Sequence, residues 1–262
     1  MSVAGAVIRS VPPRALLGAG ATLAVILLVQ LAVVVEWFPS QFVSPPSAVV
    51  VALFHLCLQS SFWIDVGYTL RGWAFGLGGA ALIAVPLGLL IGSVTPLYYS
   101  TRLVVEFLRP VPSVALVPAI VLLLGVGFEA KVFLAVFGSV WPLFVNTISG
   151  VRGIDRIKLE TARCFRLSKF RLVTSVVFPA TLPFILAGAR ISSAVALILS
   201  VTAELIIGMP GLGRSISLTQ AGGAVAEMYA LIVATGLLGI AINIVFQALE
   251  RRALHWHDGF RP

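Results

Sequence analysis

Two histidines and an aspartate near the C-terminus are the residues whose types most suggest metal chemistry. His255, His257 and Asp258 lie close together, and imidazole and carboxylate groups are common zinc ligands. The two histidines, in a polar tail beside Arg251 and Arg252, lack a third fixed ligand. We therefore predict no metal site. The sequence also lacks the Gly-x-x-x-x-Gly-Lys-Ser/Thr loop that cradles nucleotide phosphates, so no ATP chemistry is expected in this chain.

Ionisable side chains inside long apolar segments form a second group of candidates, because a charge in lipid is either paired or functional. Glu106 follows Arg102 by four residues and precedes Arg109 by three, so a regular helix places all three on one face. Glu106 can then pair with either arginine. The favoured interpretation is structural pairing, and contact with a solute is the alternative.

Three further polar residues lie in apolar segments. Arg190 and Glu204 are fourteen residues apart, about 21 Å along a helix, so they lie towards opposite ends of one span. Arg190 could contact an anionic solute, extend to the membrane boundary or bind a carbonyl, whereas Glu204 is expected to be structural. Asn146 is expected to form a hydrogen bond with a neighbouring helix.

A docking helix is predicted in the longest polar segment between apolar runs, residues 150–182. Asp155 is a good N-cap, and its carboxylate suits the positive end of a helix dipole. Thr161 and Ala162 are small where such a helix would approach a partner most closely. A weakly apolar stripe follows at spacings of three and four residues: Ile154, Ile157, Thr161 and Cys164.

The same segment predicts a second short helix. Ser168 can cap it, and it is expected to end before Pro179, because a residue before proline avoids the α conformation. Pro183 then suits the first turn of the next span. Such a segment is either a basic elbow beside anionic lipid or a rigid element that inserts into a groove on a cytoplasmic motor.

The composition explains what positions these residues. Of 262 residues, 59% are hydrophobic and 11% are charged, with a mean hydropathy of +1.07; soluble domains carry about 25% charged residues. The chain is therefore predicted to be an all-α integral membrane protein. Its net charge of +8 resides in short connections rather than on a folded basic face, which excludes a nucleic-acid partner.

Six apolar segments are long enough to span about 30 Å of hydrocarbon. The second is rich in glycine, including Gly72 and Gly76, and should allow a neighbouring helix to approach closely. The third is interrupted by Pro110 and Pro112. The predicted spans are residues 15–36, 67–92, 97–126, 130–149, 183–206 and 226–249.

The distribution of basic residues predicts the orientation. With the N-terminus inside, the inner stretches hold twelve Lys and Arg, and the outer stretches hold only Lys131 and Arg214. Both termini are therefore expected in the cytoplasm, and Cys57 and Cys164 on opposite sides of the membrane. We expect an N-terminal tail, anchor helix and external amphipathic helix capped by Ser47 (residues 1–62), a core of membrane helices with its cytoplasmic loop (63–250), and a cytoplasmic tail (251–262).

The polar segment resembles the EAA motif of permeases in binding-protein-dependent ABC importers. Glu160-Thr161-Ala162 stands at the triplet, residue 166 at the family's glycine, and Phe178-Pro179 at its Leu-Pro. Other segments resemble the branch that imports nitrate, sulfonates, taurine or bicarbonate-like solutes, and the likeness covers residues 40–257. These segments are Leu108–Pro118, Asn146-Thr147, Gly150-Val151-Arg152, Ala203-Glu204-Leu205 and Gly211-Leu212-Gly213.

The resemblance implies the fold of MetI-like type I ABC importer permeases, in the bacterial plasma (inner) membrane. It also implies a homodimer of permeases, two ATPase subunits that bind ATP and Mg²⁺, and an external solute-binding protein, while this chain binds no cofactor. The family's bend glycine is Arg166 here, so either the bend is ordinary or the motor's groove receives a long cation. The residues expected at the ATPase contact are Asp155, Glu160, Thr161, Ala162, Arg166, Ser168 and Pro179.

Two other classes of protein fit the sequence less well. A secondary transporter usually shows inverted repeats and paired broken helices near mid-membrane, whereas only the third span is broken here. A membrane enzyme needs a convergent nucleophile, base and oxyanion donor, and the histidines lie outside the spans without such partners.

Overall fold

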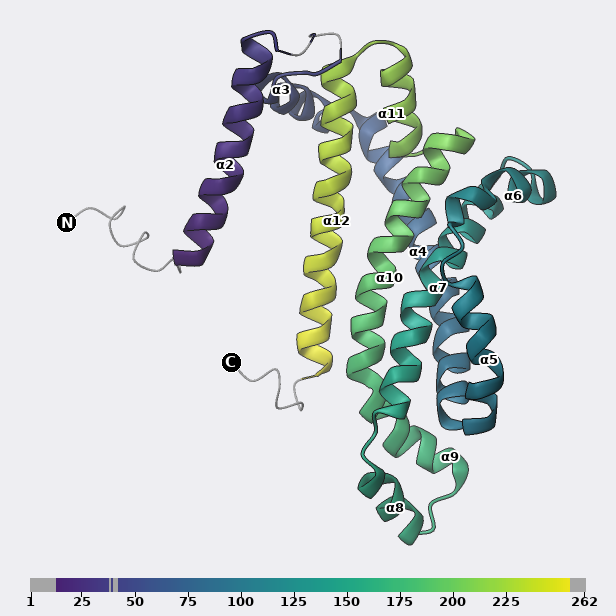
Figure 1. Ribbon diagram of the computed structural model, residues 1–262. Coiled ribbons are helices and arrows are strands. Elements are labelled where there is room, and N and C mark those ends of the chain that lie inside the picture. Colours follow the sequence, from purple (N-terminus) through teal and green to yellow (C-terminus); the bar gives the residue numbers. More distant parts are fainter. Residues whose placement is uncertain (1–12, 38, 40–41, 255–262) are drawn as a thin grey trace.

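The computed structural model describes residues 13–37, 39 and 42–254, and all regular structure within them is helical. Eleven α-helices, one 3-10 turn (η1) and one π turn (η2) follow one another along these residues (Figure 1). In order they are α2 (Pro13–Val34), α3 (Pro46–Cys57), α4 (Ser60–Ser93), α5 (Thr95–Leu108), η1 (Ser113–Leu116), α6 (Val117–Leu124), α7 (Phe128–Arg152), α8 (Arg156–Cys164), α9 (Lys169–Leu172), η2 (Val173–Val177), α10 (Phe178–Ile207), α11 (Leu212–Ala221) and α12 (Val225–Ala253).

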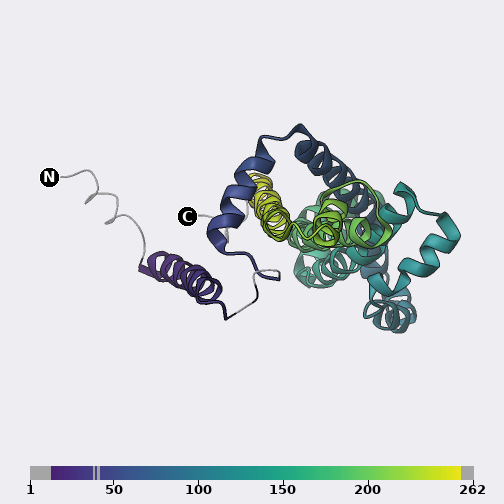
Figure 2. The same cartoon turned by 90° about the horizontal axis from the view of Figure 1, so that it is seen from above.

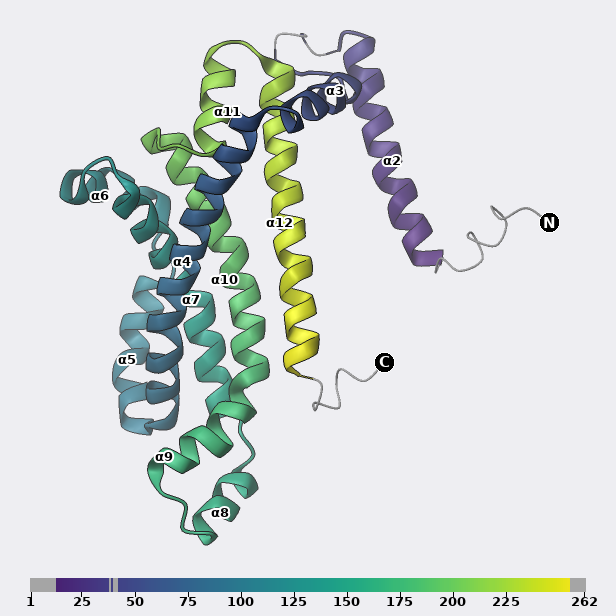
Figure 3. The same ribbon diagram turned by 180° about the vertical axis from the view of Figure 1, so that it is seen from behind.

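The centre of the fold is a bundle of α4, α7 and α10, with α12 packed beside α10 (Figures 1 and 3). The glycines of α4 face α7 directly: Gly76 lies against Ala135, and Gly72 lies against the side chain of Lys131. A Cβ at either glycine would overlap its neighbour, so these two backbones approach only because the side chains are absent. The predicted role of the glycine-rich span is confirmed.

Four helices are long and apolar enough to cross a membrane: α4, α7, α12 and the helix that runs from Phe170 to Ile207. A fifth span exists if α5 and the segment Ser113–Leu124 are counted together, although they meet at 78°. Pro110 and Pro112 lie at this break. The helix ends there because proline has no backbone N–H to donate to the preceding turn. The predicted six spans are therefore only approximate, since the apolar part of α2 within the described chain, Gly20–Val34, is shorter than a full span.

Helix α3 connects α2 to the bundle and runs across α12, while α2 stands apart (Figure 2). Val49 and Leu56 are buried in a cluster with α12, and Val50 and Phe54 on the other face are exposed. The predicted helix is present, but apolar side chains occupy both its buried and its exposed faces, so it is not amphipathic. Its capping by Ser47 is wrong: the helix begins at Pro46, and the backbone N–H of Ser47 donates to the side chain of Gln30 over 3.1 Å.

The predicted end of the second short helix before Pro179 is also wrong. Helix α9 continues through η2 into α10, whose first turn contains Pro179. Proline is tolerated there because its missing N–H is not needed in a first turn, and the π turn shifts the hydrogen-bond register just before it. Pro183, expected in the first turn of the span, lies inside α10 instead.

Candidate functional site

Helices α8 and α9 form a small hairpin beyond the ends of α7 and α10 (Figure 1). Asp155 caps α8, because its Oδ1 accepts the backbone N–H of Ile157 over 2.9 Å. Ser168 caps α9, because its hydroxyl accepts the N–H of Arg171 over 3.4 Å. Both predicted caps are confirmed, and the loop therefore holds a defined shape outside the bundle.

Arg166 occupies a left-handed backbone conformation, with φ of +49°. The backbone N–H of Leu167 donates to the carbonyl of Ala162 over 3.3 Å, which is the hydrogen bond that closes a helix in a Schellman motif. The bend therefore keeps the conformation that glycine would adopt without strain. The sequence left two alternatives: a bend of ordinary backbone conformation, or a groove on the motor that receives a long cation. The left-handed φ shows that the first of these is wrong. Within the described chain its side chain is exposed and has no acidic partner.

The outer surface of α8 mixes charge with apolar side chains. Glu160 is 61% exposed and lies 3.6 Å from Arg156 one turn away. Ile157 and Phe165 are exposed, and a groove of about 810 Å³ separates α8 from the start of α10. Its lining includes Asp155, Ile157, Thr161 and Pro179. Ala162 is buried within the chain, unlike Thr161 beside it, and its contact with a partner stays a prediction.

A buried ion pair lies at the opposite end of the bundle. The ammonium of Lys131 donates to Glu204 over 2.5 Å, and the two side chains are 2% and 0% exposed. Lys131 also donates to the carbonyl of Tyr68 over 2.9 Å. The count of basic residues in the sequence places Lys131 in an outer connection between spans. This prediction is wrong, because Lys131 lies in the first turn of α7 and its side chain faces α4 and α10.

Glu204 also anchors the short helix α11. The second carboxylate oxygen accepts the hydroxyl of Thr69 and the backbone N–H of Gly213, each over 2.9 Å. The hydroxyl of Thr69 in turn accepts the N–H of Leu212 over 3.0 Å. A carboxylate at the first turn of α11 favours its dipole, and Gly211 has a φ of +143°, a conformation that favours glycine. The structural role predicted for Glu204 is supported, since it ties α4, α7, α10 and α11 together.

The other charged candidates are paired in different ways. Glu106 accepts from Arg102 over 2.7 Å, and both side chains are exposed on α5. Arg102, Glu106 and Arg109 all line one groove of about 260 Å³, but Arg109 does not pair with Glu106. Of the two pairs that the sequence allowed, the structure forms the one between residues four apart.

Asn146 and Arg190 have partners that the sequence did not predict. The amide of Asn146 donates to the carbonyl of Pro142 in its own helix over 2.8 Å, so the expected bond to a neighbouring helix is wrong. A carbonyl one turn back is close enough for the short side chain to reach. Arg190 lies 3.4 Å from Glu250 of α12, so its partner is a carboxylate rather than a carbonyl. The pair joins α10 to α12.

No group of three or more His, Cys, Asp or Glu side chains in the described part of the chain could hold a metal ion. The histidines and aspartate of the C-terminal tail lie outside the described residues.

Comparison with known proteins identifies the class. Residues 84–255 match the family described as binding-protein-dependent transport system inner membrane component. The chain therefore belongs to this family of ABC importer permeases, whose members are multi-pass inner-membrane proteins and non-catalytic subunits. The family predicted from the EAA-like segment is confirmed.

Individual relatives agree with the proposed branch. The chain is 29% identical over 235 residues to SsuC of Escherichia coli (strain K12), a permease protein named for aliphatic sulfonates transport, covering 88% of each chain. It is 26% identical over 242 residues to the taurine transport system permease protein TauC of the same organism, covering 90% of this chain and 88% of TauC. Its fold is similar to that of a chain in the MetNI methionine ABC transporter, with a TM-score of 0.64, 19% identity and coverage of 73% of this chain and 96% of that one.

Proposed function

We propose that this chain forms the solute path of an ATP-driven importer and couples to a separate ATPase through the segment from Asp155 to Arg171. The observation that carries the proposal is the capped α8–α9 hairpin, held beyond the bundle with Glu160, Ile157 and Phe165 exposed. A loop that only binds lipid headgroups would need only basic residues. A capped helical hairpin that exposes acidic and apolar side chains together suits a protein partner.

The rest of the assembly follows from the family. Two copies of the permease would lie side by side, two ATPase subunits carrying ATP and Mg²⁺ would bind beneath them, and a solute-binding protein would deliver solute from outside. The solute class is inferred from the names of the relatives, which include aliphatic sulfonates and taurine. A small solute bearing a sulfonate-like anionic group is therefore proposed.

The continuity of α9, η2 and α10 gives the coupling a mechanical route. A movement of α8 against the ATPase would pass through the hairpin into a helix that extends unbroken from Phe170 to Ile207. Pro179 and the π turn lie at the point where this helix enters the bundle, and such turns are often sites of local adjustment. ATP binding would thus rotate α10 and open the path outward.

The two exposed cysteines test the orientation. In intact cells, a membrane-impermeant maleimide is expected to label Cys57 at the end of α3 and leave Cys164 at the end of α8 unlabelled. The variants Cys57→Ser and Cys164→Ser serve as matched controls for each other, and permeabilised cells should give labelling of both sites. Labelling of Cys164 from outside would overturn the orientation and with it the proposed contact with a cytoplasmic ATPase.

Replacing Arg166 with glycine separates its side chain from its backbone role. Because the bend is left-handed, glycine keeps the conformation and relieves a strain of about 1–2 kcal/mol. We expect Arg166→Gly to weaken retention of the ATPase nonetheless, since a guanidinium suits a carboxylate on the partner. Retention is measured by co-purification at increasing salt, with Arg166→Lys as the charge-preserving control. Unchanged retention in Arg166→Gly would show that the arginine makes no contact with the ATPase.

A further inference from the structure

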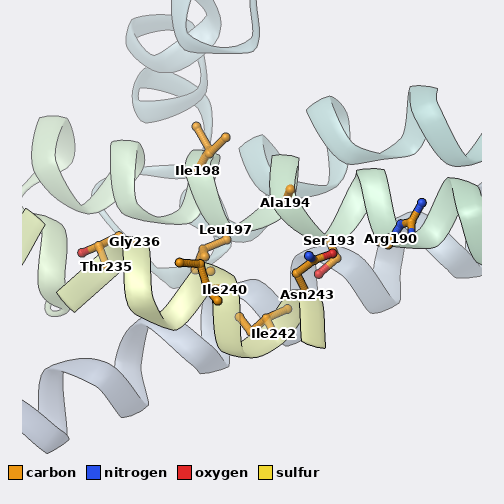
Figure 4. Close-up of a pocket in the computed structure, with 11 residues that line it drawn as sticks. Arg190, Ser193, Ala194, Leu197, Ile198, Thr235, Gly236, Ile240, Ile242 and Asn243 are labelled. Atoms are coloured by element: carbon orange, nitrogen blue, oxygen red, sulfur yellow. The ribbon is translucent and has the colours of Figure 1, made fainter. Parts of the chain in front are cut away.

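A groove of about 420 Å³ runs between α10 and α12 (Figure 4). Its lining includes no residue of the α8–α9 hairpin and neither member of the Lys131–Glu204 pair. Most of its wall is apolar, formed by Leu197 and Ile198 from α10 and Ile240 from α12. One end is polar, where Arg190 and Asn243 lie in the lining. The groove therefore has the two-part character of an amphiphile: a long apolar section and a polar end.

The polar end has unused hydrogen-bonding capacity. Arg190 is 41% exposed, and its one bond, from Nη1 to Glu250, is long at 3.4 Å. A guanidinium has five N–H donors, so most of them have no acceptor. Asn243 is exposed on α12 and has no hydrogen-bond partner among the described residues. Both side chains can therefore bind a polar group from outside the chain.

The depth of these two residues indicates which group that is. Arg190 lies 17 residues before the end of α10, about 25 Å along the helix. Asn243 lies 18 residues after the start of α12, about 27 Å along it. Both distances are counted from the helix ends opposite the α8–α9 hairpin, and the hydrocarbon layer is about 30 Å thick. With those helix ends at one boundary of the layer, both side chains lie near the other boundary, on the side of the hairpin. In the proposed orientation this is the level of the inner-leaflet headgroups.

We propose that the α10–α12 groove binds an anionic phospholipid of the inner leaflet. The phosphate lies against Arg190 and Asn243, and an acyl chain extends along Leu197, Ile198 and Ile240. Basic side chains between membrane helices on the cytoplasmic side suit anionic headgroups. The apolar wall is stabilised by contact with an acyl chain, whereas a small hydrophilic anion would bury no apolar surface there. The leaflet rests on the orientation proposed above, while the pairing of phosphate with Arg190 does not.

The bound lipid would add a contact between two helices that the Arg190–Glu250 pair already joins. Because α10 continues into the coupling hairpin, occupancy of the groove would favour one position of α10 relative to α12. Anionic lipid is therefore expected to alter the rate of transport as well as to bind in the groove.

The test uses the full permease, purified with its ATPase and placed in nanodiscs of phosphatidylcholine and phosphatidylglycerol. Lipid retained after detergent extraction is quantified by mass spectrometry. The unmodified protein should retain phosphatidylglycerol preferentially, and Arg190→Gln should reduce that preference about tenfold, the loss expected for one charge-assisted bond. Asn243→Leu should reduce it less. Arg102→Gln, which alters an exposed arginine of another groove, should leave it unchanged.

A second variant protects the test against misfolding. Ile240→Trp fills the apolar wall and keeps both polar residues, so it should also displace phosphatidylglycerol. ATPase co-purification in the same samples reports whether the complex remains assembled. If Arg190→Gln and Ile240→Trp retain phosphatidylglycerol as the unmodified protein does, the lipid site is wrong even though ATPase binding, and with it the proposed function, is intact. If taurine or an alkyl sulfonate displaces the lipid at Arg190, the groove is a solute site and the proposal is likewise wrong.

Discussion

Replacing either member of the Lys131–Glu204 pair alone is expected to destabilise the protein by about 3–5 kcal/mol, because the remaining charge would be buried without a counter-ion. Lys131→Met leaves the carboxylate of Glu204 with only Thr69 and Gly213 as donors. Glu204→Gln leaves the ammonium with the carbonyl of Tyr68 and a neutral amide. Each change also loosens α11, which Glu204 holds at its first turn.

The double variant Lys131→Met/Glu204→Gln removes both charges and should recover at least half of that loss, since no unpaired charge then remains buried. The measurement is a double-mutant cycle on unfolding midpoints of the purified permease in mixed micelles, and we expect a coupling energy of about 2 kcal/mol or more. The matched control is Arg102→Met, which breaks an exposed pair and should change stability by less than about 1 kcal/mol. If Lys131→Met is as mild as Arg102→Met, the pair does not hold the bundle together.

The loop was predictable from sequence in most of its details because its signals are local. Asp155 and Ser168 cap helices within three residues of themselves, and the family resemblance pointed to residue 166 as the bend. The left-handed conformation of Arg166 was left open, since an arginine carries no preference that reveals it. The continuous passage through Pro179 was missed because a π turn is a response to packing and has no sequence signature of its own.

The polar contacts between distant helices were the least predictable part. Lys131 and Glu204 are 73 residues apart, and a lysine near the start of a span looks like any residue at the membrane boundary. The neighbouring glycine, Gly72, makes room for the lysine side chain, but that relation appears only when α4 and α7 are packed. Asn146 shows the opposite error, because a local carbonyl satisfied a side chain that was expected to bond to another helix.

Reversing the charge of Glu160 is expected to uncouple ATP hydrolysis from transport. Glu160 is exposed, and its only partner in the described chain is Arg156, an exposed neighbour one turn away that contributes about 0.3–0.5 kcal/mol. Glu160→Lys should therefore leave the permease folded while it repels any cation that the ATPase presents to this carboxylate. We expect transport per ATP to fall about tenfold or more, the change that a loss of about 1.4 kcal/mol would produce in the equilibrium for docking of the hairpin.

Arg156→Ala is the matched control, because it removes the same intrahelical pair and keeps the carboxylate exposed. It should leave coupling within about a factor of two, since a surface pair of this kind contributes little. Thermal unfolding of both variants should match that of the unmodified permease, which separates a coupling defect from a folding defect.

Coupling through the α8–α9 hairpin is measured by the ratio of solute imported to ATP hydrolysed by the reconstituted complex, with the permease carrying Glu160→Lys or Arg156→Ala. We expect a collapse of this ratio, or loss of the ATPase subunit, with Glu160→Lys and a near-normal ratio with Arg156→Ala. A complex that carries Glu160→Lys, keeps its ATPase and transports with an unchanged ratio would contradict coupling through this hairpin.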